Sequence, residues 1–277
     1  MEKNIKSLQR YEVINMNKQN EEEKKYLFKL IEDEFSEENP FEMNLYLDNK
    51  KFSFNVIKGE NKEILYDEGL IEGFSRITDY ESIYTTITDL RYKIRYSIKK
   101  AIEYSYKEDI IEGYNCASSC EYILAYYYVE NAIFRIWVLW DILAHLCNLR
   151  YNLNVEIKDI HHGRIFSSQE STLKKYWKND PPKTIQNIIE YLKEEDILPG
   201  KFKGSYKYIR EVRNKMTHRL SIGVTSLSSY ELSFGEPLHY ILRHLCECYF
   251  NLIGFIIDIC NEIKAQSYRG DVSKCQN

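Results

Sequence analysis

Ser205–Arg219 reads SYKYIREVRNKMTHR, a basic segment of helical character around which the rest of the chain is organised. It contains Arg213 and Asn214 and, after three further residues, His218. At about 100° per residue, Asn214 and His218 lie on one helical face, with Arg213 beside it. Arginine carries a permanent, forked charge that fits a phosphate, and histidine exchanges protons near neutrality. These three residues are therefore the candidate catalytic site.

Basic residues gather on both sides of this motif. Between residues 201 and 219 only Glu211 opposes them, and Tyr206 and Tyr208 interleave with them. Basic groups bind phosphates and aromatic rings stack on unpaired bases, so the pattern indicates an RNA-binding surface. Its candidate contacts are Lys207, Arg210, Lys215 and Arg219. The alternative is a solvated, charged helix whose His218 caps its own end, because Leu220-Ser221-Ile222-Gly223 is a stop signal.

The segment resembles the HEPN superfamily, whose signature is Arg-x4–6-His near the end of a late helix in an α-helical bundle. Asn214 matches the polar residue that commonly follows the arginine, and the spacing to His218 is the shortest of that range. The resemblance extends back to an aromatic-rich helix carrying Glu130, Arg135 and Asp141, and covers about residues 80–266. The family resemblance implies an antiparallel bundle of long helices.

Many HEPN proteins are metal-independent endoribonucleases of bacterial toxin–antitoxin and other defence systems, and others only bind. The resemblance implies a homodimer with two facing motifs, an RNA substrate, and an antitoxin or defence partner protein. It implies no metal and no cofactor. Leu220 stands where some members carry a modified tyrosine, so control by that modification is not expected. The second hypothesis is a non-catalytic RNA- or protein-binding module in which Arg213 and His218 hold helices together.

Two acidic residues of the preceding long helix are candidate supports for the motif. Glu130 and Asp141 share nearly one face with Phe134, Trp137, His145 and Asn148. A carboxylate can hold a guanidinium or fix an imidazole tautomer, so either could orient Arg213 or His218. The alternative is pairing with Arg135 within the chain, or plain exposure.

The composition predicts a mainly α, packed chain. Of its 277 residues 44% are hydrophobic and 14% aromatic, with only 11 glycines and 5 prolines. Apolar stripes at helical spacing predict helices over 21–35, 77–111, 117–151, 171–177, 183–192 and 236–265. The net charge of −4 excludes a uniformly basic nucleic-acid binder but not a local patch. Lys, Asn, Ile and Tyr richness suggests an AT-rich bacterial genome.

The N-terminal part reads differently from the rest. Residues 1–76 are interpreted as an appendage, with one helix followed by alternating residues between 41 and 66 that predict a small β-hairpin. Residues 77–277 are interpreted as the helical bundle. The start is polar, without a signal peptide, and charged residues interrupt the most apolar stretches, so a cytoplasmic chain that does not span a membrane is expected.

The remaining histidines and cysteines offer weaker signals. His161-His162-Gly163-Arg164 lies in a connection, where a phosphate-contacting loop is favoured over a zinc site because no further ligand is near. The seven cysteines fall mostly within helical patterns, so they are predicted to be small core residues in a reducing compartment.

Overall fold

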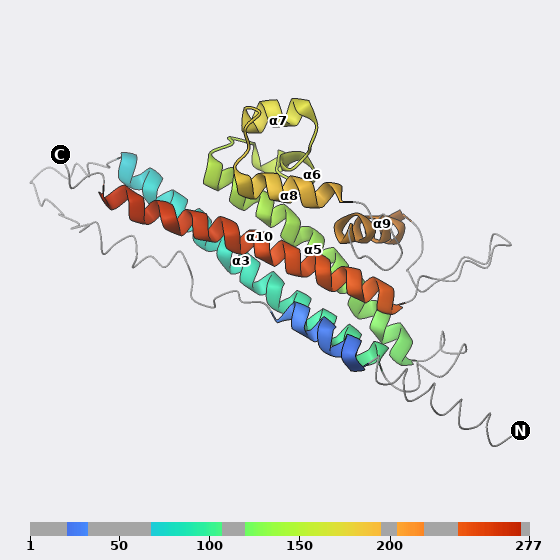
Figure 1. Ribbon diagram of the computed structural model, residues 1–277. Helices are drawn as coiled ribbons and strands as arrows, with labels where there is room; N and C mark the ends of the chain where they lie inside the picture. Colours follow the sequence, from blue (N-terminus) through green and yellow to red (C-terminus); the bar gives the residue numbers. More distant parts are fainter. Residues whose placement is uncertain (1–20, 33–67, 107–119, 195–203, 219–237, 273–277) are drawn as a thin grey trace, which may run out of the picture. The chain divides into compact units, whose positions relative to one another are not determined.

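The computed structural model describes residues 21–32, 68–106, 120–194, 204–218 and 238–272. Side chains are described for residues 21–32 and, within the other ranges, for residues 79–263 except His218. Every regular element in these ranges is helical (Figure 1). The predicted mainly α fold is confirmed. The β-hairpin predicted between residues 41 and 66 lies outside the described residues.

Three long helices hold most of the residues that the structure describes: α3 over Glu68–Ser105, α5 over Cys120–Tyr151 and α10 over Leu238–Val272. The shorter elements are a helix over residues 21–31, α6 (His162–Ile165), α7 (Glu170–Trp177), α8 (Lys183–Lys193), α9 (Ser205–His218) and a 3-10 turn, η2 (Ile157–Asp159). Predicted helix bounds agree within a few residues for α5, α7 and α8. The predicted helix 77–111 starts earlier, at Glu68.

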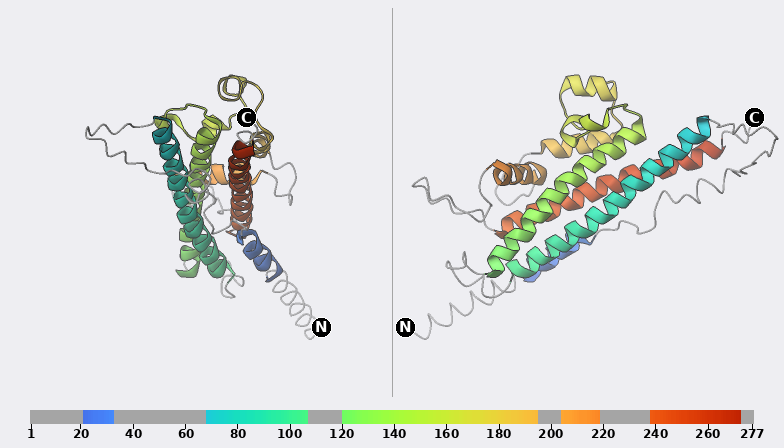
Figure 2. Two further views of the ribbon diagram at one scale, coloured as in Figure 1. Left: turned by 90° about the vertical axis from the view of Figure 1, so that its left-hand side faces the viewer. Right: turned by 180° about the vertical axis from the view of Figure 1, so that it is seen from behind.

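The residues group into two compact units, and each long helix contributes to both. Unit 1 comprises Met1–Glu34, Arg91–Trp137 and Glu190–Ile253, and therefore holds all of α9. Unit 2 comprises Phe35–Leu90, Val138–Ile189 and Gly254–Asn277. Figure 2 gives further views of the helices that supply both units.

The core of unit 1 is built from the apolar stripes of its helices. Leu242, Leu245, Tyr249 and Leu252 of α10 are fully buried, as the near-heptad spacing of this helix predicts. They share this core with isoleucines of α3 and with Leu27 and Ile31 of the helix over 21–31, which are also buried. Burying each such side chain stabilises the fold by about 1.5–3 kcal/mol. The helix over 21–31 is thus part of this core, whereas the boundary at residue 76 stays a prediction.

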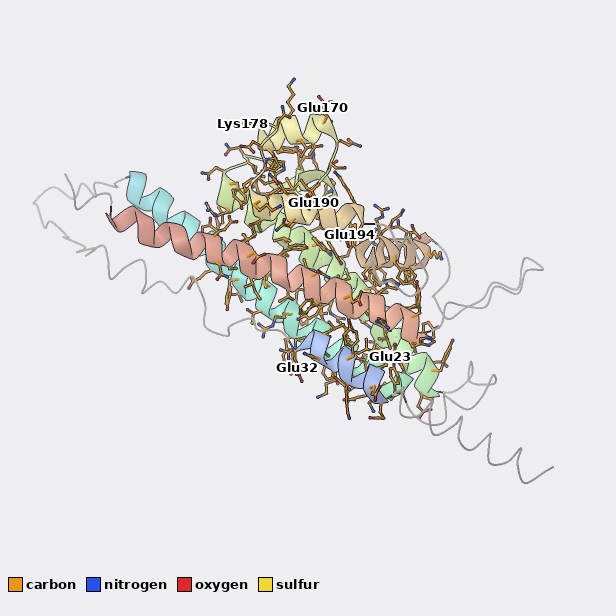
Figure 3. All side chains as sticks on the ribbon, in the orientation of Figure 1. Glu23, Glu32, Glu170, Lys178, Glu190 and Glu194 are labelled. Atoms are coloured by element: carbon orange, nitrogen blue, oxygen red, sulfur yellow. The ribbon has the colours of Figure 1, made fainter. Side chains whose placement is uncertain are left out.

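Unit 2 packs short helices against the second halves of α5 and α10. Trp140 and Leu143 of α5 and Ile185 and Ile188 of α8 are fully buried here. Glu262 of α10 accepts hydrogen bonds from Tyr151 and Thr184. Figure 3 labels Glu170 and Lys178 at the two ends of α7, a placement of charge that suits the helix dipole.

The outward face of α5 differs from what its apolar pattern suggests. Ala125, Val129, Ile133 and Ile136 face the core, and so do Trp140 and Leu143 further along. In contrast, Ile123, Tyr127 and Phe134 are 59%, 57% and 44% exposed. The helix is apolar on more than one side, so periodicity alone does not identify the side that packs.

Two of the helices are long and apolar enough to cross a membrane by length and composition, Cys120–Tyr151 and Leu238–Ile263. About half of each apolar window is buried within the protein, as in the core helices of a soluble domain. This burial agrees with the expectation of a chain that does not span a membrane, and the cytoplasmic location stays a prediction.

Candidate functional site: the motif helix and its anchors

The motif lies on α9, a helix with one buried and one open face. Tyr206, Ile209 and Val212 are buried at helical spacing and dock α9 into unit 1. Arg210, Asn214 and Lys215 are exposed, and Arg213 is half-buried between the two faces. His218 is the last residue of α9, as the stop signal predicts. The helix therefore presents the motif at its C-terminal end.

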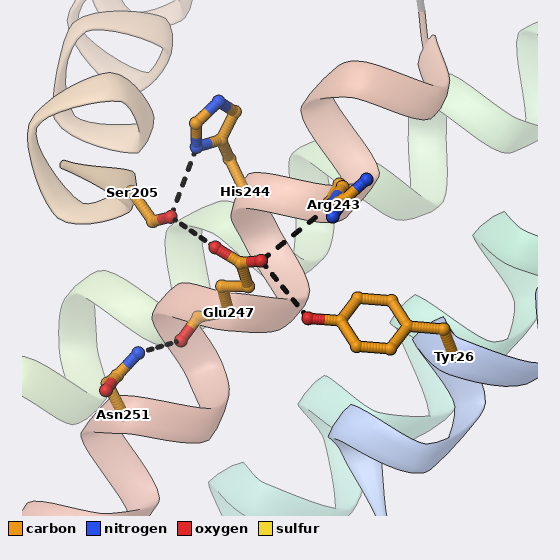
Figure 4. Close-up of polar contacts among 6 residues, drawn as sticks. All are labelled: Tyr26, Ser205, Arg243, His244, Glu247 and Asn251. Atoms are coloured by element: carbon orange, nitrogen blue, oxygen red, sulfur yellow. Dashed lines mark hydrogen bonds and ion pairs between the residues drawn. The ribbon is translucent and has the colours of Figure 1, made fainter. Parts of the chain in front are cut away.

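The first residue of α9 is held by a partly buried polar cluster (Figure 4). The hydroxyl of Ser205 donates to Oε2 of Glu247 across 3.1 Å, and the Oγ of Ser205 also lies 3.1 Å from Nδ1 of His244. A carboxylate only accepts and serine has one proton, so His244 donates from Nδ1 to Ser205. Tyr26 and Arg243 approach the other oxygen of Glu247. The cluster connects α9, α10 and the helix over 21–31.

A second anchor holds the middle of α9 through an aromatic stack. The indole of Trp137 lies parallel to the ring of Tyr206, with centroids 5.3 Å apart. The guanidinium carbon of Arg213 lies 5.4 Å from the Trp137 centroid. Tyr206 and Arg213 are two turns apart on α9, or about 10 Å along the helix axis. A flat indole ring fits between two side chains at this spacing. Trp137 therefore sits between them and places the Arg213 guanidinium.

Apart from one bond to Asn214, the guanidinium donors of Arg213 have no hydrogen-bond partner among the described residues. Its Nη1 donates to Oδ1 of Asn214 across 3.3 Å, and its main-chain carbonyl accepts a bond from Thr217. Nε is buried, and within the described part of the chain no hydrogen-bond partner reaches it and no carboxylate pairs with the guanidinium. An arginine held by a ring rather than by a carboxylate keeps its charge for a bound anion.

The predicted RNA-binding residues fall on different parts of α9. Arg210 and Lys215 are exposed, and Lys207 is half-buried. The Arg210 guanidinium lies 6.0 Å from the Tyr206 ring centroid. Lys207 and Lys215 also interact with other groups of the chain. Arg219 and the side chain of His218 lie outside the described residues, so their roles stay predictions.

The two acidic residues predicted to support the motif have separate surroundings. Asp141, in unit 2, lies 2.6 Å from Nδ1 of His162, and the main-chain N–H of His162 donates to the same oxygen across 3.0 Å. Burial raises the pKa of Asp141, but the two hydrogen bonds from His162 and the electrostatic attraction of His162 and His161 together outweigh burial and hold this pKa below its ordinary value. Glu130, in unit 1, is half-buried and interacts within the chain. Asp141 thus fixes His162 in unit 2, a role not expected from the sequence.

His162 is correspondingly a structural residue of unit 2 and not part of an open phosphate-contacting loop. Its side chain is only 6% exposed and lies near the Trp140 ring. His162 is therefore not a candidate phosphate contact, whereas a phosphate-contacting role for the rest of this connection stays a prediction. No group of three or more His, Cys, Asp or Glu side chains that could hold a metal occurs among the residues that the structure describes.

The sequence does not identify the anchors Trp137, Ser205 and Glu247 as site residues. Trp137 lies on the helical face that carries Glu130, and nothing local indicates that it contacts a residue about seventy positions later. The helical spacing of Tyr206 and Arg213 offers one signal, since two turns between a ring and a cation leave room for a third flat group.

Comparison with known proteins identifies one family. The model of the Cthe2314-like HEPN family matches residues 76–252, which is more than half of the chain and includes all of α5 and α9. No curated protein and no solved structure matches the chain.

Proposed function

The chain belongs to the HEPN superfamily, and from this premise we propose that it is a metal-independent endoribonuclease of a bacterial toxin or defence type. Membership alone indicates a nuclease or an RNA-binding type of module. The finer proposal rests on one observation: Arg213 is held against Trp137 while no described carboxylate takes its charge. A purely structural arginine would have its donors satisfied by fixed partners.

The proposed reaction uses the 2′-hydroxyl of the RNA as the nucleophile. His218 takes the proton of this hydroxyl, the oxygen attacks the adjacent phosphorus, and the bond from phosphorus to the 5′-oxygen breaks. The departing 5′-oxygen receives a proton, so the products are a 2′,3′-cyclic phosphate and a 5′-hydroxyl. Arg213 stabilises the negative charge that develops on the phosphate oxygens, and Asn214 hydrogen-bonds the phosphate or holds His218.

A homodimer completes the proposed site. One motif supplies a single histidine, whereas the attacking and the departing oxygens each exchange a proton. Two motifs facing each other would provide one histidine for each exchange. Arg210, Lys215, Lys207 and Arg219 would contact RNA phosphates. An antitoxin or other defence protein is the proposed further partner, and the cytoplasm the proposed location.

The test is cleavage of a mixed single-stranded and structured RNA in excess EDTA. We expect the parent to cleave, Arg213→Ala to lose roughly 10²–10³-fold and His218→Ala roughly 10²–10⁴-fold in rate. Lys158→Ala and Lys178→Ala remove exposed charges of unit 2 as controls and should keep the parent rate. A folded parent without cleavage, or cleavage that survives both motif substitutions, would instead favour the non-catalytic binding module.

A further inference from the structure

A second basic and aromatic surface lies in unit 1, on the C-terminal part of α3. We name it the α3 face, and its members lie within about 60° of Tyr96 on the helix. They are Tyr92, Lys93, Tyr96, Lys99 and Lys100. Tyr92 is 74% exposed and Tyr96 49%. Glu103 lies on the same side and pairs with Lys100 across 2.6 Å, and the exposed Asp89 precedes Tyr92 on that side. Three lysines against these two carboxylates leave a net positive charge.

Ring contacts join the α3 face to α5. Tyr96 meets Tyr128 edge to face with centroids 6.3 Å apart, and Tyr104 stacks on Tyr128 at 5.9 Å. Tyr128 in turn contacts the exposed ring of Tyr127 at 5.3 Å. The tyrosines of the two helices therefore form one continuous aromatic surface.

The exposed ridge of α5 leads from this surface to the motif. Tyr127 and Phe134 lie within about 20° of each other around the axis of α5, and we call these two exposed rings the α5 ridge. Around the same axis, Tyr128 lies about 100° to one side of Tyr127 and Trp137 about 80° to the other side. Tyr128 contacts α3, and Trp137 carries Arg213 of α9. The exposed rings of Tyr127 and Phe134 consequently lie between the α3 face and the candidate catalytic arginine, all within unit 1.

We infer that the α3 face and the α5 ridge bind single-stranded RNA and guide it to Arg213, an inference that rests on the proposed ribonuclease function. Bases stack on the exposed rings, and phosphates lie along the lysines of α3. Charge complementarity favours RNA over a protein partner. Lysines alternate with tyrosines on the α3 face, whereas lysine is depleted from the buried cores of protein interfaces. Glu130 lies toward the motif side of the ridge but already interacts within the chain.

The test measures binding of 2′-O-methyl RNA, which lacks the nucleophile and stays intact. Single-stranded oligonucleotides of about 4 and about 16 nucleotides span the range of known single-strand sites. The variant is Tyr92→Ala/Lys99→Gln, which removes an exposed ring and an exposed ammonium. The control Phe250→Ala/Lys25→Gln likewise removes an exposed ring and an exposed ammonium, from elements outside the α3 face and the α5 ridge. Fluorescence anisotropy gives Kd at several salt concentrations.

We expect the variant to raise Kd for the long oligonucleotide roughly tenfold, with no change for the short one. Losing one phosphate contact should also reduce the slope of log Kd against log salt by about 0.7. A rise in Kd no larger than that of the control would overturn the inference. A changed dimer equilibrium with an unchanged Kd would also overturn it, because a second copy of the chain would then be the occupant of this surface. If the parent binds but does not cleave unmodified RNA, the nuclease proposal fails while this surface stands.

Discussion

Ser205 and Glu247 lie 42 positions apart in sequence, yet the hydroxyl of the first donates to the carboxylate of the second across 3.1 Å. Ser205 is only 2% exposed and His244 is fully buried beside it. The Glu247 side chain is 17% exposed, so the bond fixes the start of the motif helix to α10 in a largely buried place. Removing it leaves buried polar atoms without their partner.

We expect Ser205→Ala to lower the free energy of unfolding by about 1–3 kcal/mol, because Glu247 and His244 lose their shared hydroxyl. Urea unfolding of parent and variant measures this difference. Ser171→Ala is the matched control, since Ser171 is exposed on α7, and it should change stability by less than about 0.5 kcal/mol. Equal stabilities of the two variants would contradict the anchoring role.

Trp137 is expected to act through Arg213 in addition to packing. Leucine at this position keeps an apolar contact but offers no ring face, whereas phenylalanine keeps a ring. We therefore expect Trp137→Leu to lower kcat/KM for RNA by roughly tenfold or more, and Trp137→Phe to restore most of it. If the two variants have similar unfolding free energies, the larger loss of kcat/KM in Trp137→Leu is due to the missing ring and not to weaker packing.

The matching measurement uses Arg213→Ala as background. If Trp137 works by placing the guanidinium, Trp137→Leu should add little to the loss caused by Arg213→Ala, since contacting residues are not additive. Fully additive losses would show that Trp137 serves only the packing of α9.

The helices could be predicted from the sequence because their patterns are local. The stripe from Leu238 to Ile259 on α10 is buried as its spacing predicts, and the motif ends at the close of α9 as the stop signal indicates. The chain contains few glycines and prolines, so the boundaries are set by a small number of clear breakers.

The partners of individual side chains could not be predicted in the same way. Asp141 and His162 are joined by the path of the connection after α5, and Trp137 meets Arg213 only because α9 docks beside it. Such pairs depend on how helices pack, which periodicity does not encode. The outward ridge of Tyr127 and Phe134 is a further example, because α5 carries apolar residues on several sides.

The cysteines of the helices should differ in reactivity according to burial. Cys120 is exposed, whereas Cys147, Cys246, Cys248 and Cys260 are buried, which confirms the prediction of core residues for these four. Burial also raises the pKa of the Cys147 and Cys246 thiols, so little thiolate forms there. With a thiol reagent on native protein at pH 8, Cys120→Ser should remove one rapidly reacting equivalent.

Cys246→Ser provides the comparison for that experiment. It should leave the rapid phase unchanged and affect only the thiols that react after unfolding. Rapid modification that disappears with Cys246→Ser would mean that the core of unit 1 opens far more readily than its packing indicates.

Asp141 should make the stability of unit 2 depend on acid pH. Burial is the largest single effect and raises its pKa, yet the hydrogen bonds from His162 and the attraction of His162 and His161 together outweigh it, so the pKa lies below its ordinary 3.8. The folded protein therefore takes up this proton less readily than the unfolded chain. The stabilisation is complete above the ordinary value and is lost as pH falls through the lowered pKa of the folded state.

We expect Asp141→Asn to lower the free energy of unfolding by about 1–3 kcal/mol at pH 7, since His162 is buried and loses a charged partner. The difference from the parent should shrink progressively below about pH 4, where the parent carboxylate also becomes neutral. Urea unfolding between pH 7 and pH 3 measures both. Asp159→Asn breaks the exposed pair with Arg164 and should cost less than about 1 kcal/mol. A parent–variant difference that stays constant over this range would show that the Asp141 charge contributes nothing and that only the shape of the side chain matters.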